Sequence, residues 1–521
     1  MYIGGGNTLK RLHAVGIALL FAGFACGGAH AAARHVTPGS MDKNSRELFQ
    51  ESMTLGDQAW DKDTKLISTG GVAAHESVAI RHMVRESSWY AFGLLVRDGK
   101  GDRQKAAEIL EAVLKEQYLV AGTRWYGTFR RSPEEAEPKA EAVMWKEYDP
   151  NWREFIGCTF AMILIEYPDR IPAELARQMY ASIDHALEGE RKEGRLVPSY
   201  SNIALMYGFL WDFAAVHDQQ ASWKEQSAQW TESVYRLFKE NNSFFEYNSP
   251  TYYGVDLYGL ALWRDYGSCE RIRTMGSEME GTLWRDIAVF YQPKLRNVSG
   301  PYDRSYGMDM ESYVSVVGVW LRTVLSAGTA PLPRIEASTD HVADAWFAPQ
   351  FVVLGTKIPS DAMTNFQRFQ GEHLVRRQIT KERTATAWIG KEVIYGGEFT
   401  SKTKDAGTTT QFHPATVQWR TPSGKVGWIR LIECPLVDAT ADEHGLTIVA
   451  TGDIRLRLFA PNSVPSKISS SRWELPGLNV EVSSDAKGFT QTKSGDALDV
   501  TYSGMTKMTL SIGPVTVQDK K

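Results

Sequence analysis

Residues 202–216 read NIALMYGFLWDFAAV, a run whose apolar side chains recur at helical spacing. Similar runs fill residues 45–325, and they end at short stretches rich in Pro, Gly or Asn. The clearest of them are residues 74–96, 103–117, 153–167, 173–187, 202–216 and 222–238. About ten to twelve helices fit this part of the chain.

The connections between these helices are mostly short, which favours antiparallel neighbours. Helical hairpins in series build either an open solenoid or a closed double ring, and a solenoid shows a sequence repeat of about 30–45 residues. No such repeat is evident, and polar and aromatic clusters interrupt the helices at irregular positions. We therefore expect an α/α toroid over residues 34–330, with loops that converge on a site at one end of the ring.

The hydrophobic period changes after the helices. Residues 328–340 contain Pro331 and Pro333 and little periodicity, which predicts a linker over residues 331–345. Short, β-branched, often alternating runs follow, separated by turns such as Ser423-Gly424. This pattern predicts an antiparallel β-sandwich over residues 346–521, so the fold class is a multidomain α and β protein.

The N-terminus has the features of an export signal. Lys10 and Arg11 precede an apolar run, and Ala29-His30-Ala31 is a candidate cleavage motif within the small residues that follow. The apolar run is shorter than the roughly 20 residues that span a bilayer. We expect a signal peptide over residues 1–33, a secreted or periplasmic protein and no stable membrane insertion after cleavage; a lipid anchor on Cys26 is the alternative.

Composition excludes several classes of protein. The net charge of −4 gives no basic surplus, so nucleic acid is not an expected partner. Cys158, Cys269 and Cys434 are an odd, scattered set, which indicates neither a disulfide framework nor a zinc site. No phosphate-binding glycine motif or metal-spaced His/Glu motif is evident, so we expect no cofactor and no metal. The oligomeric state stays open.

The densest group of functional side chains lies in residues 296–310. Gly300-Pro301 breaks the preceding helix, and Tyr302, Arg304 and Tyr306 follow in what is expected to be a loop. Polar and aromatic density of this kind inside a helical domain indicates a site. The alternative is that the aspartates cap a helix and the tyrosines pack beneath the loop.

Residues 246–256 form a second group, directly before a helical run. Asn248, Tyr252 and Tyr253 are the candidates for substrate binding, because paired aromatic rings suit the apolar faces of sugars. Asn248 or Ser249 also fits a helix N-cap followed by proline, and the tyrosines also fit a core.

A third group joins cations to aromatic rings. Arginine is shaped to clamp a carboxylate with two hydrogen bonds, so arginines among aromatic platforms suit an acidic sugar polymer. Ordinary salt bridges on a solvated loop are the equal alternative. The residues are Arg124, Trp125, Arg130 and Trp152.

These groups fit β-elimination from a uronate, which needs a charge neutraliser, a base and an acid. Arg304 or Asn202 is expected to hold the carboxylate, and Tyr306 to act as base if a nearby cation lowers its pKa from about 10. His413, at a break between two β segments, is the expected acid. Return of the proton by Tyr306 itself is the alternative.

The architecture resembles heparinase-like and alginate lyases, which join an α/α toroid to an antiparallel β domain. Residues 248–256 and 300–307 resemble segments of the glucuronan and alginate lyases of polysaccharide lyase family 38. The resemblance implies a Tyr base with an Asn, Arg or His neutraliser, carried here onto Tyr306, Asn202, Arg304 and His413. In toroid lyases a catalytic His often follows the Asn, whereas Ile203 follows Asn202 here.

The sequence thus predicts a polysaccharide lyase acting on an acidic, uronate-containing polysaccharide of the glucuronan or alginate type. A noncatalytic, secreted glycan-binding protein is one alternative. A glycoside hydrolase on the same toroid is the other, because hydrolysis uses two carboxyl groups and fold alone does not exclude it. Its candidate carboxylates are Glu246, Asp256, Asp303 and Asp309.

Overall fold

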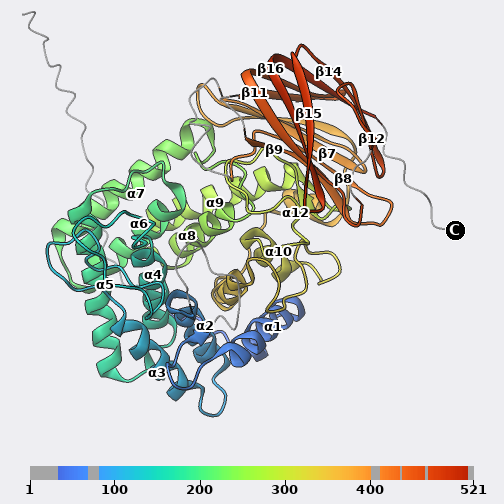
Figure 1. Cartoon of the computed structure of the whole chain (residues 1–521). Coiled ribbons are helices and arrows are strands. Elements are labelled where there is room, and N and C mark those ends of the chain that lie inside the picture. The colour runs from blue at the N-terminus through green and yellow to red at the C-terminus, as the bar shows by residue number, and fades with distance from the viewer. Residues whose placement is uncertain (1–32, 69–80, 401–410, 434–436, 464–466, 514–521) are drawn as a thin grey trace, which may run out of the picture.

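The computed structural model describes residues 33–68, 81–400, 411–433, 437–463 and 467–513. A helical domain is followed by an antiparallel β domain, as the sequence predicts (Figure 1). The expected signal peptide falls almost entirely on residues outside these ranges. Within them, no helix is both long and apolar enough to cross a membrane.

The helical domain is a double ring. Its inner helices contact one another in chain order, and α1 (Lys43–Ala59) closes the ring by contacting both α10 and α2. Each of the first four inner helices also packs against the helix that follows it in the chain. The inner helices are α2 (Val84–Arg97), α4 (Trp152–Glu166), α6 (Ser201–His217), α8 (Tyr252–Tyr266) and α10 (Val316–Val324). The outer helices are α3 (Asp102–Lys115), α5 (Ala173–Glu193), α7 (Ala221–Asn241) and α9 (Glu270–Phe290).

Sequence explains which helices lie inside. Every residue of α4 is buried, as is α6 from Ser201 to Ala215, because these helices are apolar on all sides and need neighbours all round. In α7 only Ser227, Thr231, Val234 and Phe238 are buried, one stripe at helical spacing. The stretch at residues 202–216 is therefore a wall of the inner ring.

Helices continue past the boundary expected near residue 346. The η3 turn (Val342–Phe347), α11 (Ala348–Leu354) and α12 (Ser360–Gln367) precede the first strand of the sheet, which begins at His373. All residues of α11 are buried, and this helix contacts α1, α2, α8 and α10. The segment expected to begin the β domain thus completes the core of the ring.

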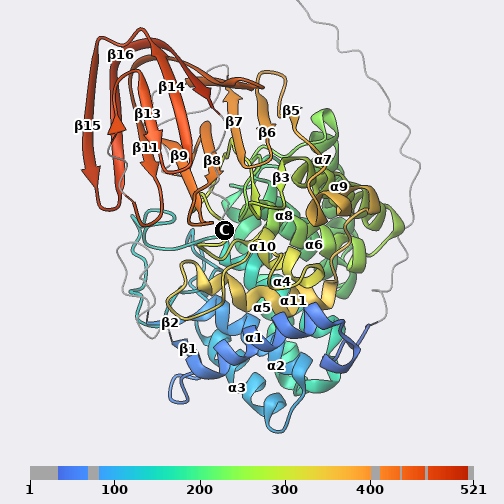
Figure 2. The same ribbon diagram turned by 90° about the vertical axis from the view of Figure 1, so that its right-hand side faces the viewer.

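The β domain is one antiparallel sheet (Figure 2). Along its main path the strands run in the order β12-β13-β14-β16-β11-β9-β8-β7-β6-β5, while β10 pairs with β11 and β7, and β15 pairs with β16. The strands are β5 (His373–Gln378), β6 (Thr384–Ile389), β7 (Val393–Phe399), β8 (Ala415–Arg420), β9 (Val426–Glu433), β10 (Val437–Asp442), β11 (Gly445–Phe459), β12 (Lys467–Ile468), β13 (Arg472–Leu475), β14 (Leu478–Ser484), β15 (Gly488–Ser494) and β16 (Ala497–Ile512).

This topology differs from the expected two-sheet sandwich, because five strands close into a ring. Strand β7 pairs with β8, β8 with β9, β9 with β11, β11 with β10, and β10 with β7. The cause lies in β11, whose first half pairs with β10 and whose second half pairs with β9. Its register shifts between Val449 and Ile454, and irregularities of this kind bend a strand, so one strand serves both sides of the ring.

A buried arginine joins the two domains. Arg383 Nη2 lies 2.7 Å from both carboxylate oxygens of Asp303, and its Nε lies 2.8 Å from Glu398 Oε1. The three residues are 6%, 1% and 0% exposed, respectively. Nearby, a Cβ atom at Gly396 of β7 would lie 1.8 Å from Gly300 O, so only glycine permits this contact between strand and loop.

We predict that Arg383→Ala lowers the free energy of unfolding by about 3–5 kcal/mol, because Asp303 and Glu398 are left as buried carboxylates without this cation. Urea denaturation followed by tryptophan fluorescence measures the change. Arg285→Ala is the matched control, since the Arg285–Asp361 pair is solvent-exposed and is expected to contribute less than about 1 kcal/mol. Equal losses in the two variants would contradict the assignment.

Candidate functional site

The site lies where two loops of the helical domain meet the β domain. One loop, residues 300–307, follows the short strand β4 (Asn297–Val298), and its backbone pairs with the β domain through Tyr302 and His413. The other, residues 246–251, leads into α8. Side chains from these loops and from the N-terminal ends of α6 and α8 converge on the guanidinium of Arg304.

Arg304 is held on three sides. Its Nη2 donates a hydrogen bond to the Tyr252 hydroxyl at 2.6 Å, its Nη1 donates to Glu246 Oε1 at 2.8 Å, and its Nε donates to Gln411 Oε1 at 3.1 Å. The guanidinium carbon also lies 3.7 Å from the centre of the Tyr252 ring, a cation–π contact. The arginine is thereby fixed in position while 27% of its side chain stays exposed.

Asn202 supports the far side of Glu246. Its Nδ2 donates to Glu246 Oε2, and Ser201 Oγ lies 3.4 Å from the same oxygen. Each carboxylate oxygen of Glu246 therefore has its own partner, Arg304 on one side and the start of α6 on the other. The structure brings together Asn202 and Arg304, the two expected neutralisers, through a glutamate that the sequence suggested only for hydrolysis.

Two tyrosine hydroxyls lie side by side next to this arginine. The hydroxyl oxygens of Tyr252 and Tyr306 are 2.6 Å apart, and the Tyr306 ring stacks on His341 with ring centres 4.2 Å apart. Burial raises the pKa of Tyr306, although the hydrogen bond from Tyr252 and the charge of Arg304 oppose this. Burial also raises the pKa of Tyr252. The expected lowering of the Tyr306 pKa is therefore wrong for this state, and both phenols are protonated at neutral pH.

Two further charged groups, Arg85 and Asp344, influence the pKa of Tyr306. Asp344 N donates to His341 O at 3.0 Å, and the His341 ring stacks on Tyr306. Helix α2, which carries Arg85, packs against the η3 turn, which carries Asp344. Arg85 donates to Glu86 Oε1 at 2.6 Å, and its guanidinium lies over the rings of Trp89 and Trp152 at 4.7 and 5.2 Å.

Asp344 has the pKa shift in this region that bears most on catalysis. Burial raises its pKa to about 7, Arg85 lowers it and Glu86 raises it further. A carboxyl that titrates near neutrality is suited to proton transfer. Asp344 was not among the residues expected to act on substrate, because it is isolated in the sequence.

His413 does not fit the role of the acid. It is 1% exposed, its Nδ1 lies 3.3 Å from Leu431 O, and its Nε2 faces Arg430 Nη1 at 3.3 Å. Burial lowers its pKa to about 3, and the charge of Arg430 acts in the same direction. The ring is therefore neutral and enclosed at neutral pH, so it has no proton of suitable acidity to give to a substrate.

Three expected substrate-binding residues are structural. Tyr302 is 1% exposed, donates to Val298 O and accepts a 2.6 Å hydrogen bond from Gln418 Nε2. Asn248 Nδ2 donates to Ser299 O and Pro301 O, which ties the two loops together. Tyr253 is 2% exposed and belongs to the core.

The four residues of the third sequence group, Arg124, Trp125, Arg130 and Trp152, do not lie together at the site. Trp125 is 5% exposed and packs in a small cluster with Tyr148, while Arg130 lies over the Tyr118 ring at 4.9 Å. Arg124 is exposed and 3.6 Å from Glu193, and in the described residues none of these three contacts the Arg304 group. Trp152 is linked to the site, because the Arg85 guanidinium lies over its ring. No group of three or more metal-ligating side chains occurs in the described parts of the chain.

The chain belongs to a protein family that is defined by sequence and whose function is not known. The model of a domain of unknown function (DUF8769) matches residues 46–356, which is more than half of the chain, and it covers the ring and the Arg304 loop. The model of a second domain of unknown function (DUF8770) matches residues 371–510, the sheet. No curated protein matches this sequence.

Among solved structures, heparinase III aligns over 94% of this chain and 88% of its own, with 8% identity and a TM-score of 0.42. A Streptomyces coelicolor chondroitin AC lyase variant aligns over 91% and 79%, with 10% identity and a TM-score of 0.35. A GH127 β-arabinofuranosidase aligns over 94% and 81%, with 8% identity and a TM-score of 0.37. At these TM-scores nothing about the reaction of this protein follows from the likeness.

We predict that Asp344→Asn changes how stability depends on pH. The folded-state pKa of this carboxyl is raised from 3.8 to about 7, so its contribution to stability falls as pH rises between these values. Relative to the wild type, the variant should gain stability across that window, on the order of a few kcal/mol, and the gain should level off above pH 7. Urea denaturation at a series of pH values measures this difference, and a gain that is independent of pH would contradict the shifted pKa.

Proposed function

We propose that this protein is a secreted or periplasmic polysaccharide lyase, which cleaves a uronate-containing acidic polysaccharide by β-elimination. The observation that supports this most directly is the hydrogen-bonded chain from Arg304 to Tyr252 to Tyr306. It joins a fixed cation to two phenols at a partly exposed position, which is the combination that proton abstraction beside a carboxylate needs.

Charge neutralisation comes first in this reaction. The proton on C5 of a uronate is hard to remove while the adjacent carboxylate keeps its full charge, so a cation or amide donor must meet that carboxylate. Arg304 is the proposed donor, and Glu246 and Gln411 are positioning residues that hold its guanidinium. Asn202 is 1% exposed and donates to Glu246, so it supports that carboxylate. Arg85 offers a second cation for a polymer that carries a charge on each sugar.

Tyr306 is the proposed acid and base. Because it is protonated at rest, its hydroxyl proton passes to the glycosidic oxygen on C4, and its oxygen takes the proton from C5. The electrons of the C5–H bond form the C4–C5 double bond, and the bond from C4 to the leaving oxygen breaks. Tyr252 donates to the developing phenolate while Arg304 donates to Tyr252, so the charge is stabilised without a histidine.

Glucuronan and alginate are the proposed substrates, on the ground of the family 38 resemblance in residues 248–256 and 300–307. Acidic polymers of this kind match a site that presents Arg304 and Arg85.

A glycoside hydrolase is the second candidate, and Asp344 is the observation that favours it. A carboxyl with a pKa of about 7 can act as general acid, and Glu246 offers a second carboxylate. The other carboxylates suggested by the sequence are enclosed, since Asp256, Asp303 and Asp309 are 0%, 1% and 7% exposed. Glu246 is already paired with Arg304 and Asn202, which suits support of the arginine better than attack on a sugar.

We predict that the protein, incubated with glucuronan or alginate, raises ultraviolet absorbance through an unsaturated uronate, and that Tyr306→Phe lowers the rate by about 10²–10⁴-fold because the transferred proton is lost. Tyr235→Phe is the matched control, since the Tyr235 hydroxyl bonds Glu278 between two outer helices, away from Arg304. New saturated reducing ends without absorbance would support hydrolysis instead. Binding without either product would support a glycan-binding protein.

We also predict that Glu246→Gln lowers kcat for elimination by about 10–100-fold, the loss expected for weakening a charge-assisted hydrogen bond to Arg304. The product should remain an unsaturated uronate, and Asp344→Asn should retain elimination. Initial rates of absorbance with chromatography of the products measure both effects. If Asp344→Asn abolishes turnover while Tyr306→Phe does not, the carboxylates perform the chemistry and the elimination proposal fails.

A further inference from the structure

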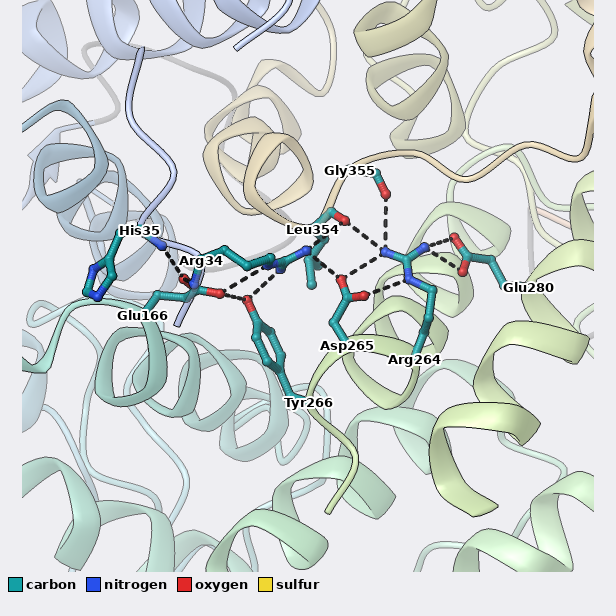
Figure 3. A network of polar contacts seen from close by, with 9 residues as sticks. All are labelled: Arg34, His35, Glu166, Arg264, Asp265, Tyr266, Glu280, Leu354 and Gly355. Atoms are coloured by element: carbon teal, nitrogen blue, oxygen red, sulfur yellow. Dashed lines mark hydrogen bonds and ion pairs between the residues drawn. The ribbon is translucent and has the colours of Figure 1, made fainter. Parts of the chain in front are cut away.

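The first described residues are bound tightly to the helical ring. The backbone nitrogen of Arg34 lies 2.7 Å from Glu166 Oε2, and the backbone nitrogen of His35 lies 3.1 Å from the same oxygen (Figure 3). The Arg34 side chain donates to the Tyr266 hydroxyl at 2.8 Å and to Asp265 Oδ2 at 3.0 Å. The chain is thus fixed at Arg34 itself.

Glu166 is an unusual residue at this position. It is the last residue of α4, where the carbonyl ends of the helix disfavour a negative charge, and its side chain is 0% exposed. The carboxylate receives hydrogen bonds from the Arg34 and Tyr266 side chains as well as from the two backbone nitrogens. A buried carboxylate at a helix C-terminus requires compensating positive charge.

The charges of this network do not balance. In the network of Figure 3 the guanidinium groups of Arg34 and Arg264 form ion pairs with the carboxylates of Glu166, Asp265 and Glu280, so one carboxylate has no cation to match it. Burial raises the pKa of Glu280 to about 7 even though Arg264 lies 2.7 Å away and lowers it. One more positive charge in the network would match cations to carboxylates.

The backbone nitrogen of Arg34 is the atom that can supply that charge. It donates at 2.7 Å to Glu166, and it would be an ammonium group if the chain began at this residue. Ala31 and Ala33 are small residues at the third and first positions before the Ala33–Arg34 bond, the spacing that export peptidases recognise. The expected signal peptide of residues 1–33 ends at this bond, whereas cleavage after Ala31, at the Ala29-His30-Ala31 motif, would leave a neutral amide against Glu166.

We propose that a signal peptidase hydrolyses the Ala33–Arg34 peptide bond, and that the new α-ammonium group of Arg34 forms an ion pair with Glu166. Water supplies the hydroxyl that completes the Ala33 carboxyl and the proton that completes the Arg34 amine. The pair lies among the C-terminal ends of α4 and α8, and Arg34 and Arg264 also bond Leu354 O at the end of α11. Maturation therefore stabilises the ring at the end of α8 opposite Tyr252.

The first test identifies the N-terminus. The full chain is expressed with export in a bacterial host, and the mature protein is analysed by intact mass and N-terminal sequencing. The expected result is a chain that begins at Arg34. A chain that begins at Ala32, a lipid-modified Cys26 at the N-terminus, or a chain that retains residues 1–33 would overturn the proposal.

The second test isolates the charge. A protein that begins at Arg34 is compared with one that begins at Ala33, which keeps an N–H at the same position but moves the ammonium group away. We predict that the Arg34 form melts about 2 °C higher at pH 7, a shift of the size that one such ion pair gives. In Glu166→Gln, the two forms should melt at the same temperature. Equal melting temperatures of the two forms with Glu166 present would overturn the ion pair.

The pH dependence has a definite sign. A carboxylate neighbour raises the pKa of an α-amino group above its usual value near 8, so the added stability is present below about pH 8 and is lost as pH rises through the higher value. Glu166 of α4 contacts the amine nitrogen, and Asp265 and Tyr266 of α8 contact the Arg34 side chain. The ring of His35 lies against Tyr167, at the end of α4. The melting difference should therefore disappear at high pH, and a difference that persists there would contradict an ammonium origin.

Discussion

Arg383 carries a positive charge in an interior that would otherwise exclude it, and the position of the candidate site depends on how that charge is compensated. Asp303 comes from the loop of the helical domain and Glu398 from β7, so the two carboxylates must approach the same guanidinium from different domains. Neither carboxylate can move away from Arg383 without a large energetic cost, because a buried charge without its partner is no longer compensated. Arg304 follows Asp303 directly, and its direction is fixed by this bridge.

Arg304 in turn organises the chemistry. Its three donor directions are taken by a phenol, a carboxylate and an amide, so it cannot swing toward solvent without breaking charge-assisted hydrogen bonds. The phenols beside it remain protonated because burial outweighs its charge. A site of this kind is set to stabilise a phenolate that forms during a reaction, rather than to hold one before substrate arrives.

The sequence predicted the parts of this structure that depend on local pattern. The apolar run at residues 202–216 indicated a helix, and Arg304, Tyr306, Tyr252 and Asn202 do converge. Pattern could not reveal that Tyr302 lies against Gln418 or that His413 is enclosed beside Arg430, because those contacts join distant segments. Alternation along β11 also gave no sign that this strand changes neighbours halfway. Asp344 becomes a candidate only in the structure, where its backbone bonds His341, the residue that stacks on Tyr306.

The order of helices in the ring sets the time at which the ring can form. Helix α1 buries Leu48, Phe49 and Met53 in the core that α10 and α11 complete, and those helices come near residues 316–354. Helix α1 therefore cannot complete its packing until α10 and α11 have been synthesised. The apolar surface of the N-terminal segments stays uncovered through most of synthesis. Closure between such distant residues is slow compared with local helix formation. This delay suits the export proposed above, because the ring cannot close before α10 and α11 have been synthesised.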